Sequence, residues 1–446
     1  MSRGFESHAL RSTAFVTRSR GEVRPMSAEE LKRDRSRRAR APQPRAIARH
    51  GRLRQSRAWK TVLGFIGASL AVTFVATASV AGLALYQFTS EVADNSVDIN
   101  GAVAAPIPEI GAYEGGFNIL VVGTDAYSDR EGSRNDVNIV VHVSADQTSA
   151  VAVSIPRDMV VRFPGCVNPD TGKTWGVGTF PINNALLYGG LPCAVTVIEN
   201  FTGLDIQYAG MIGFDGVANL ATAVGGVQIC LTKAIHDKKS GIDLEAGTHY
   251  LSGWDALAFL RTRYGVGDGS DLTRISSQQA FLSALLRKLK SEDTLTNVGK
   301  LLSLANVARQ NMTLSTELSQ PATMVAMAKA LSRIPTDRIT FVQYPGSTGG
   351  TGVYEGKVQP NMNLGNRLMD AIRSDQAIGL DSAGDGRGAE LDPNAPPPAD
   401  PAVPDPSVTP DPTTSPTDAP VLPEKVVISG IRGQTAADQT CSVGRG

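Results

Sequence analysis

One uncharged segment divides this chain into two parts that must lie in different surroundings. Val62 to Leu85 is a run of 24 residues without a single charged side chain. As a helix this run would be about 36 Å long, enough to cross a hydrocarbon core of about 30 Å. It is too long, and too far from the start, for the apolar part of an ordinary secretion signal. The sequence therefore predicts one transmembrane helix over residues 61–86.

The charges on either side of this segment predict its orientation. Residues 26–60 carry twelve Lys and Arg against three Asp and Glu, whereas residues 86–116 carry no Lys or Arg and five acids. An excess of Lys and Arg marks the cytoplasmic flank of a span. We therefore expect a single-pass cell-membrane protein with a basic cytoplasmic segment over 1–60, starting at Met1 or Met26, and everything after the span outside. The basic segment lacks a helix-turn-helix pattern, so nucleic acid is not an expected partner.

Composition divides the outer part further. Residues 87–115 form an acidic stalk, and residues 116–384 alternate short β-rich runs with helical patterns, which is typical of a layered α/β domain. Residues 385–425 are rich in Pro and Asp and predict a disordered linker. A short C-terminal patch over 426–446 follows, and we expect it to dock back onto the domain.

The α/β domain has a clear pattern of expected elements. The run "VAVSIP" is apolar at consecutive positions, as expected for a central strand covered on both faces. Expected strands are 117–123, 137–143, 149–155, 207–214, 227–231 and 339–344. Expected helices are 183–189, 193–201, 215–223, 253–262, 274–290, 297–309 and 318–332.

All four cysteines fall on the predicted outer side, where an oxidising compartment permits disulfides. They form no C-x-x-C pair and no Cys/His cluster, which argues against zinc. Cys166 and Cys193 flank one loop region and are the first candidates for a disulfide. Cys230 could pair with Cys441, but spacing alone leaves this connectivity open.

Three clusters of opposite charges lie at the ends of predicted elements. The first holds Asp125, Arg134 and Asp136, the second holds Arg157 and Asp158, and the third is "RTRYGVGDGSDLTR" over 261–274. Taken singly, each is ordinary: an Asp after a strand is commonly an Asx-turn residue, and Arg at a helix end offsets the helix dipole. Together they supply carboxylates suited to a hard cation and guanidinium groups suited to phosphate oxygens.

The order and spacing of the motifs "NILVVGTD", "SRNDVNIVVHV", "VAVSIPRDMVV", "FLRTRY" and "GDGSDLTRISSQQAFL" resemble the LytR-CpsA-Psr family of cell-envelope phosphotransferases, from about Asn118 to Ser291. The Arg-rich composition and the cysteine positions resemble the actinobacterial branch. The resemblance implies a three-layer α/β/α fold with a mixed central sheet. It also implies that a glycopolymer passes from a polyprenyl-pyrophosphate carrier to peptidoglycan through a phosphodiester link.

The same resemblance implies roles for individual residues. The metal ligands for Mg²⁺ (or Mn²⁺) would be Asp125 and Asp136. The pyrophosphate would be bound by Arg134, Arg157, Arg261, Arg263, Arg274 and Gln278. The residues expected to act in catalysis are Asp125, Arg134, Asp136, Arg157, Arg261 and Arg263. The carboxylates expected to orient the arginines are Asp158, Asp268 and Asp271. An apolar tunnel between sheet and helices would hold the prenyl chain.

The chain departs from the family pattern at two positions. Tyr127 stands where the family often has Arg, and Ser277 replaces the Arg of an Arg-Gln-Gln motif, which we interpret as a lost pair on a helix surface. Tyr127 favours an alternative, a non-catalytic scaffold that binds lipid pyrophosphate or wall polymer, and a lipid pyrophosphatase is a further alternative. The glycine-rich "PGSTGGTG" over 345–352 lacks the Lys-Ser/Thr of a phosphate-binding P-loop.

Overall fold

The computed structural model describes residues 62–63, 66–67, 69, 96–99, 116–125, 134–168, 171–292, 294–382, 384, 388–395 and 422–445. The chain divides into two compact units, Met1–Val75 and Ala76–Gly446. The described residues of the first unit are helical. Within the described part of the chain, no helix has the length and apolar character needed to span a membrane. Most of the expected span over 61–86 lies outside the described residues, as do most of the expected stalk and linker.

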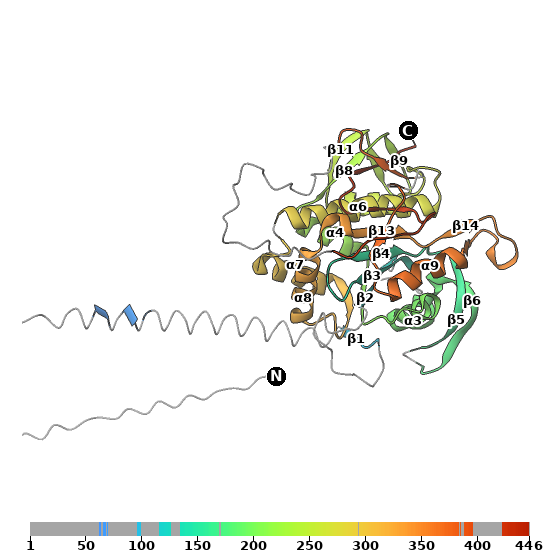
Figure 1. Ribbon diagram of the computed structural model, residues 1–446, viewed down its shortest axis with the longest axis horizontal. Helices are drawn as coiled ribbons and strands as arrows, with labels where there is room; N and C mark the ends of the chain where they lie inside the picture. The colour runs from blue at the N-terminus through green and yellow to red at the C-terminus, as the bar shows by residue number, and fades with distance from the viewer. Residues whose placement is uncertain are drawn as a thin grey trace, which may run out of the picture. The chain divides into compact units, whose positions relative to one another are not determined.

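The second unit is built around a mixed sheet of eight strands (Figure 1). Their order is β1 (Ser96–Val97), β12 (Met312–Ser315), β7 (Tyr208–Ile212), β2 (Phe117–Thr124), β3 (Asn135–Val143), β4 (Ala150–Ser154), β13 (Ile339–Gln343) and β19 (Gly433–Thr435). The pairs β1–β12, β2–β7 and β4–β13 are parallel, and the other pairs are antiparallel. All five residues of β4 are buried, which confirms the prediction of a central strand covered on both faces.

Helices cover both faces of this sheet because the apolar residues of its strands alternate between two cores. Leu120 of β2 and Val153 of β4 face a core shared with α3 (Ala185–Thr202) and α9 (Met362–Arg373). Phe117 and Ala152, from the same two strands, face the opposite core. That core includes residues of α6 (Asp271–Ser291), α7 (Val298–Asn311) and α8 (Pro321–Arg333). The expected three-layer α/β/α fold with a mixed sheet is therefore confirmed.

A second sheet covers the outer side of α6 (Figure 1). Its strands are, in order, β11 (Gly247–Leu251), β8 (Val227–Leu231), β20 (Thr440–Ser442) and β17 (Ala389–Leu391). The apolar core beneath it joins Val227 of β8 and Phe281 of α6 to Phe259 of α5 (Gly253–Arg261). Helix α4 (Phe214–Ala223) packs beside α5. This layer is where the third charged cluster of the sequence lies.

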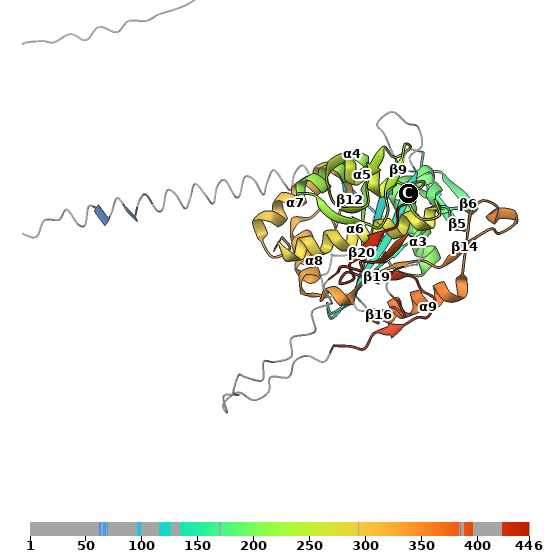
Figure 2. The same ribbon diagram turned by 90° about the horizontal axis from the view of Figure 1, so that it is seen from above.

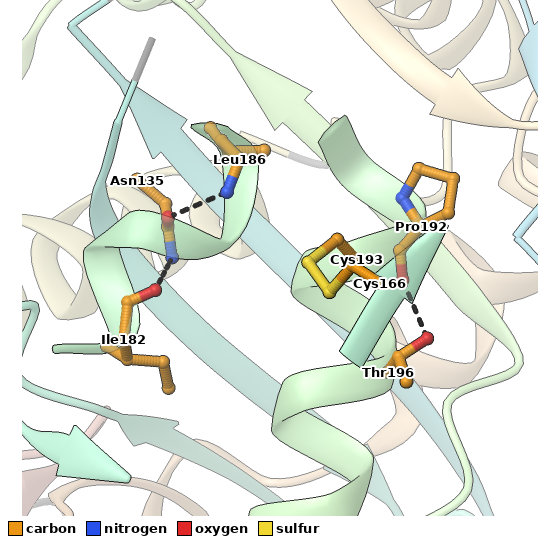
Figure 3. The surroundings of a disulfide bond; sticks show 7 residues. All are labelled: Asn135, Cys166, Ile182, Leu186, Pro192, Cys193 and Thr196. Carbon is orange, nitrogen blue, oxygen red and sulfur yellow. Dashed lines mark hydrogen bonds between the residues drawn. A yellow bond between two sulfur atoms is a disulfide. The ribbon is translucent and has the colours of Figure 1, made fainter. Parts of the chain in front are cut away.

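Several short elements complete the described part. Two-stranded pairs are β5 (Val160–Val167) with β6 (Thr174–Pro181), β9 (Ile235–Asp237) with β10 (Ile242–Leu244), β14 (Gly346–Thr348) with β15 (Val358–Pro360), and β16 (Ile378–Gly379) with β18 (Val426–Val427). Single 3₁₀ turns are η1 (Ile182–Asn184), η2 (Thr336–Arg338) and η3 (Gly352–Tyr354). A disulfide joins Cys166 of β5 to Cys193 of α3, as predicted (Figure 3).

The segment after the expected linker is part of the fold. Strand β19 is the last strand of the central sheet, β20 lies in the second sheet, and both contact α6 (Figure 2). A disulfide between Cys230 of β8 and Cys441 of β20 fixes this arrangement. Gly444 then passes so close to the chain that a Cβ there would lie 2.2 Å from the carbonyl oxygen of Ala234, so no larger residue fits. The expectation that the segment docks back is confirmed.

Candidate functional site

A β-bulge shapes the first charged cluster. Gly123 pairs with Val137 and Thr124 pairs with Asn135, so Asp136 is the extra residue between them. Bulges next to functional sites redirect a side chain, and Asp136 lines the main cavity of the described chain. Asp125 follows β2 directly, and its Oδ1 accepts a hydrogen bond from the backbone N–H of Arg134 at 3.2 Å.

Arg134 itself does not join the other arginines. It precedes β3, it is exposed, and it is not among the described residues that line the cavity. In a regular strand, Arg134 and Asp136 would point to the same side, because they are two residues apart. The bulge at Asp136 interrupts this regular alternation, which no sequence pattern indicated.

Asn135 fixes the bulge in place, although the sequence analysis did not single it out. Its Nδ2 donates to the carbonyl oxygen of Ile182 at 3.0 Å (Figure 3). The same Nδ2 donates to Oδ1 of Asn138 at 2.6 Å. Its Oδ1 accepts from the backbone N–H of Leu186 at 3.3 Å. Asn135 is fully buried, and these bonds connect the start of β3 to the start of α3. The backbone of the next residue, Asp136, is therefore held in place.

Arg157 is surrounded by three carboxylates. Its Nη1 donates to Oδ1 of Asp136 at 2.5 Å, and its Nε lies 3.6 Å from Oδ2 of Asp158 and 3.4 Å from Oδ1 of Asp271. Burial acts to lower the pKa of Arg157, but the charges of Asp136 and Asp271 raise it above its ordinary value. Asp158 also lies 3.2 Å from Nζ of Lys357. The guanidinium is therefore held as a permanent cation.

Arg274 is the most deeply buried arginine of the cluster. Its Nη2 donates to the backbone oxygen of Asp136 at 2.8 Å and lies 2.9 Å from Oδ1 of Asp271, three residues earlier on α6. Burial lowers the pKa of Arg274, and the charge of Asp271 opposes this effect. One turn further along α6, Nε2 of Gln278 donates to the carbonyl oxygen of Leu260 at 3.0 Å.

The start of α6 explains why two nearby aspartates behave differently. Ser270 caps the helix by accepting from the backbone N–H of Thr273. Asp268 accepts from the backbone N–H of Ser270 at 2.8 Å and from the hydroxyl of Thr273. Asp271, in the first helical turn, instead reaches Arg157 and Arg274. Asp158 and Asp271 thus contact arginines, whereas Asp268 holds the start of the helix through Ser270 and Thr273.

Arg261 and Arg263 have a different environment. Arg261, the last residue of α5, is exposed, and its guanidinium carbon lies 4.1 Å from the ring centroid of Phe214. Arg263 is partly buried, and its Nε has no hydrogen-bond partner. Neither arginine has a carboxylate within ion-pair distance in the described part of the chain. Ser277, by contrast, is fully buried, so the interpretation of a lost helix-surface pair is wrong.

Asp237 positions residues 262–264, and no sequence pattern identified it. Its Oδ2 accepts from the hydroxyl of Thr262 at 2.8 Å and from the backbone N–H groups of Arg263 at 3.2 Å and Tyr264 at 3.3 Å. Burial acts to raise the pKa of Asp237, but these hydrogen bonds bring it below its ordinary value. The residue lies at the end of β9, and only the folded chain brings β9 and the end of α5 together.

The arginines open onto an apolar cavity of about 670 Å³. The described residues that line it include Asp136, Arg157, Arg261, Arg263, Arg274 and Gln278, with apolar residues from the sheet, α4, α5, α6 and α7. Along α6 the lining changes from Arg274 and Gln278 to Leu285 and Leu289. At ~1.5 Å per residue, Arg274 and Leu289 are about 22 Å apart along the helix axis. The cavity is therefore charged at one end of α6 and apolar toward the other.

Fold and site define an α/β protein in which an arginine–carboxylate cluster lies at the mouth of a long apolar cavity. The chain belongs to the LytR_cpsA_psr family, whose match covers residues 80–369. The resemblance found in the sequence is confirmed.

Curated relatives include cell wall biosynthesis proteins. The chain is 28% identical to LcpA of Corynebacterium glutamicum over 297 residues, which are 59% of this chain and 56% of LcpA. It is 32% identical over 274 residues to the probable cell wall biosynthesis protein LcpB of the same organism, covering 57% of this chain and 60% of LcpB. It is 26% identical over 248 residues to TagT of Bacillus subtilis, named as a polyisoprenyl-teichoic acid–peptidoglycan teichoic acid transferase, covering 53% of this chain and 72% of TagT. The matches thus span little more than half of the two Corynebacterium proteins.

Proposed function

We propose that this chain is a membrane-anchored phosphotransferase that moves a glycopolymer from a polyprenyl-pyrophosphate carrier to peptidoglycan. The observation that carries the proposal is the arginine cluster that opens onto a long apolar cavity. The donor has a charged diphosphate next to an apolar prenyl tail, which matches the charged and apolar parts of this cavity. TagT of Bacillus subtilis is named for a transfer of this kind.

The donor fits the site in two parts. The prenyl tail lies along α6 against Leu285 and Leu289, where burial of apolar surface stabilises binding by about 25 cal/mol per Å². The diphosphate lies against Arg157, Arg263 and Arg274. Guanidinium groups suit this task because they stay charged and bind two phosphate oxygens at once.

The two carboxylates at the bulge fit a hard divalent cation. Asp125 and Asp136 lie at the adjoining ends of paired strands, and carboxylate oxygens are the ligands that Mg²⁺ and Mn²⁺ prefer. Asp125 and Asp136 would hold the cation, while Arg157 donates a hydrogen bond to Oδ1 of Asp136. When bound, the cation would neutralise charge on the diphosphate.

The reaction needs positioning and charge stabilisation more than covalent chemistry from the protein. A bond forms between the acceptor hydroxyl and the sugar-linked phosphorus, and the bond to the lipid phosphate breaks. Arg157 and Arg274 hold the diphosphate in place, and Arg261 and Arg263 neutralise the leaving lipid phosphate. Asp125 would accept the hydroxyl proton if it is not wholly used as a metal ligand.

The predicted location agrees with this chemistry. A prenyl-linked donor stays at the bilayer surface, so an anchor over 61–86 would keep the enzyme beside its substrate. The two disulfides fit an oxidising compartment outside the cytoplasm.

The test uses the full chain in detergent with a prenyl-pyrophosphate oligosaccharide, peptidoglycan fragments and Mg²⁺. Mass spectrometry should detect a sugar-phosphate-muropeptide, which should vanish with EDTA and with Asp136→Ala. Asp370→Ala is the matched control, because Asp370 is an exposed carboxylate on α9, on the other face of the sheet. Lipid binding without any product would instead support the scaffold. Release of lipid monophosphate without a muropeptide product would support the pyrophosphatase.

A further inference from the structure

Tyr264 is an exposed aromatic side chain at the mouth of the cavity, directly after Arg263. It is 49% exposed and lines the cavity. Tyr250 and Trp254 are more exposed, but neither is among the described lining residues. The ring of Tyr264 therefore lies where a ligand that leaves the arginine cluster toward solvent would pass.

One carboxylate holds the backbone of Tyr264 and of Lys239, which contacts the tyrosine ring. The backbone N–H groups of Tyr264 and Lys239 donate to the two oxygens of Asp237, at 3.3 Å and 2.9 Å. Nζ of Lys239 lies 4.1 Å from the ring centroid of Tyr264. One buried carboxylate thus fixes both partners of a cation–π contact. Binding to such a preorganised surface loses little conformational entropy.

The surroundings of the ring suit a sugar better than a phosphate or a lipid. A hexose has an apolar face of C–H groups, which packs on an aromatic ring, and a rim of hydroxyl groups. Nζ of Lys239 lies over one face of the Tyr264 ring, so the sugar would pack on the opposite face. Lys239, the hydroxyl of Ser240 and the phenol of Tyr264 offer polar groups around that rim, and all three residues line the cavity. The hydrogen bond and charge of Lys239 lower the pKa of the Tyr264 phenol, which makes its O–H a stronger donor.

We infer that Tyr264 and Lys239 form a binding site for the first sugar of the lipid-linked donor. This inference rests on the proposed function, since it places the sugar next to the diphosphate. Arg263 and Tyr264 are consecutive residues, as the diphosphate and the first sugar are consecutive groups of the donor. The pair selects donors by their sugar, whereas the arginines bind any prenyl diphosphate.

The experiment compares two lipids of one prenyl length, a diphosphate alone and a diphosphate carrying one N-acetylglucosamine, by titration against the full chain in detergent. Tyr264→Ala should weaken binding of the sugar-bearing lipid about 5- to 10-fold, the range expected for one aromatic contact. It should leave the sugar-free lipid within about twofold. Tyr264→Phe should keep most of the affinity, because it retains the ring. Arg263→Ala should weaken both lipids, and Tyr250→Ala, on an exposed tyrosine outside the cavity, should weaken neither.

The outcomes separate the inference from the proposal on which it rests. If Tyr264→Ala weakens both lipids equally, or neither, while the wild-type chain binds both, the sugar site is overturned and the proposed function stands. If the wild-type chain binds neither lipid, the proposed function fails and the inference fails with it.

Discussion

The four arginines at the cavity mouth form two groups that differ in how far the protein already neutralises them. Arg157 and Arg274 share the carboxylate of Asp271. Arg157 also donates to the carboxylate of Asp136 at 2.5 Å, and Arg274 donates to the backbone oxygen of Asp136 at 2.8 Å. Arg261 and Arg263 have no carboxylate within ion-pair distance among the described residues. The first group is part of the structure, and the second group carries positive charge that a ligand can use.

This difference predicts that the first group contributes mainly to stability and the second group mainly to activity. Removing one partner of a buried ion pair leaves an uncompensated charge, which costs far more than losing a surface charge. Removing an unpaired arginine costs little in the free protein, because no internal partner is lost. The first group should therefore be tested in unfolding experiments and the second in turnover.

The largest expected effect is on stability in Arg274→Ala. This change leaves the buried Asp271 without its closest cation, so the free energy of unfolding should fall by about 3–5 kcal/mol. Urea unfolding followed by circular dichroism measures it. Arg367→Ala, an exposed position on α9, is the control and should stay within about 0.5 kcal/mol. A loss below about 1 kcal/mol in Arg274→Ala would contradict the view that this arginine is structural.

The next effect is on turnover in Arg263→Ala and Arg261→Ala. Each should lower turnover about 100-fold, equivalent to about 2.7 kcal/mol, as the loss of one charge partner of a transition state does. The free energy of unfolding should change by no more than about 0.5 kcal/mol. Formation of the muropeptide product, measured beside urea unfolding of the same samples, tests both statements. Near-normal turnover in both variants would refute the role given to the unpaired group.

A smaller effect should appear when Asp271→Asn is added to Arg274→Ala. The second change removes the charge that the first leaves unpaired, so the double variant should regain about 1–2 kcal/mol relative to Arg274→Ala. A double-mutant cycle of unfolding free energies measures this coupling. Simple additivity of the two single changes would mean that the pair is not coupled.

The smallest effect concerns the carboxylate that positions the unpaired group. Because hydrogen bonds lower the folded pKa of Asp237, its stabilising contribution is complete above the unfolded pKa of about 3.9 and is lost as the pH falls through the folded pKa. Asp237→Asn should therefore destabilise the chain by about 1 kcal/mol near pH 6. The difference from wild type should shrink as the pH falls below about 4. Urea unfolding from pH 3 to pH 7 measures it, and a difference that stays constant would contradict the linkage.

Most elements were predicted from sequence, and several weakly patterned strands were missed. Helix α9 was also missed, although its buried residues follow a helical period. All six expected strands form within a few residues of their expected bounds. The expected helices 183–189 and 193–201 form as the two helical parts of α3, separated by non-helical backbone at Gly189 and Gly190. The β5–β6 hairpin was missed because Pro and Gly interrupt its pattern, and β19 because "GQT" has no apolar alternation.

The candidate site shows the same limit. Charged residues at strand ends were expected to converge, and Asp136, Arg157 and Arg274 do so around Asp271. Asp237 was not found, because its partners lie 25 to 27 residues away along the chain and meet it only through tertiary packing. Nor could sequence show the bulge that separates Arg134 from Asp136. The chemical roles of these residues stay predictions.

The C-terminal strands support one part of the candidate site, so that part can form only after these strands pack. The backbone N–H of Gly267 donates to the carbonyl oxygen of Val443 at 2.9 Å, and the backbone N–H of Arg445 donates to the carbonyl oxygen of Gly265 at 3.0 Å. The end of the described chain therefore supports the backbone of residues 265–267, directly after Arg263. Cys441 closes a covalent loop back to Cys230, 211 residues earlier. During folding, a chain without residues 440–445 would lack these hydrogen bonds and this disulfide. Asp237 would still hold the backbone of Arg263 and Tyr264, but residues 265–267 would gain their support only when the C-terminal strands pack.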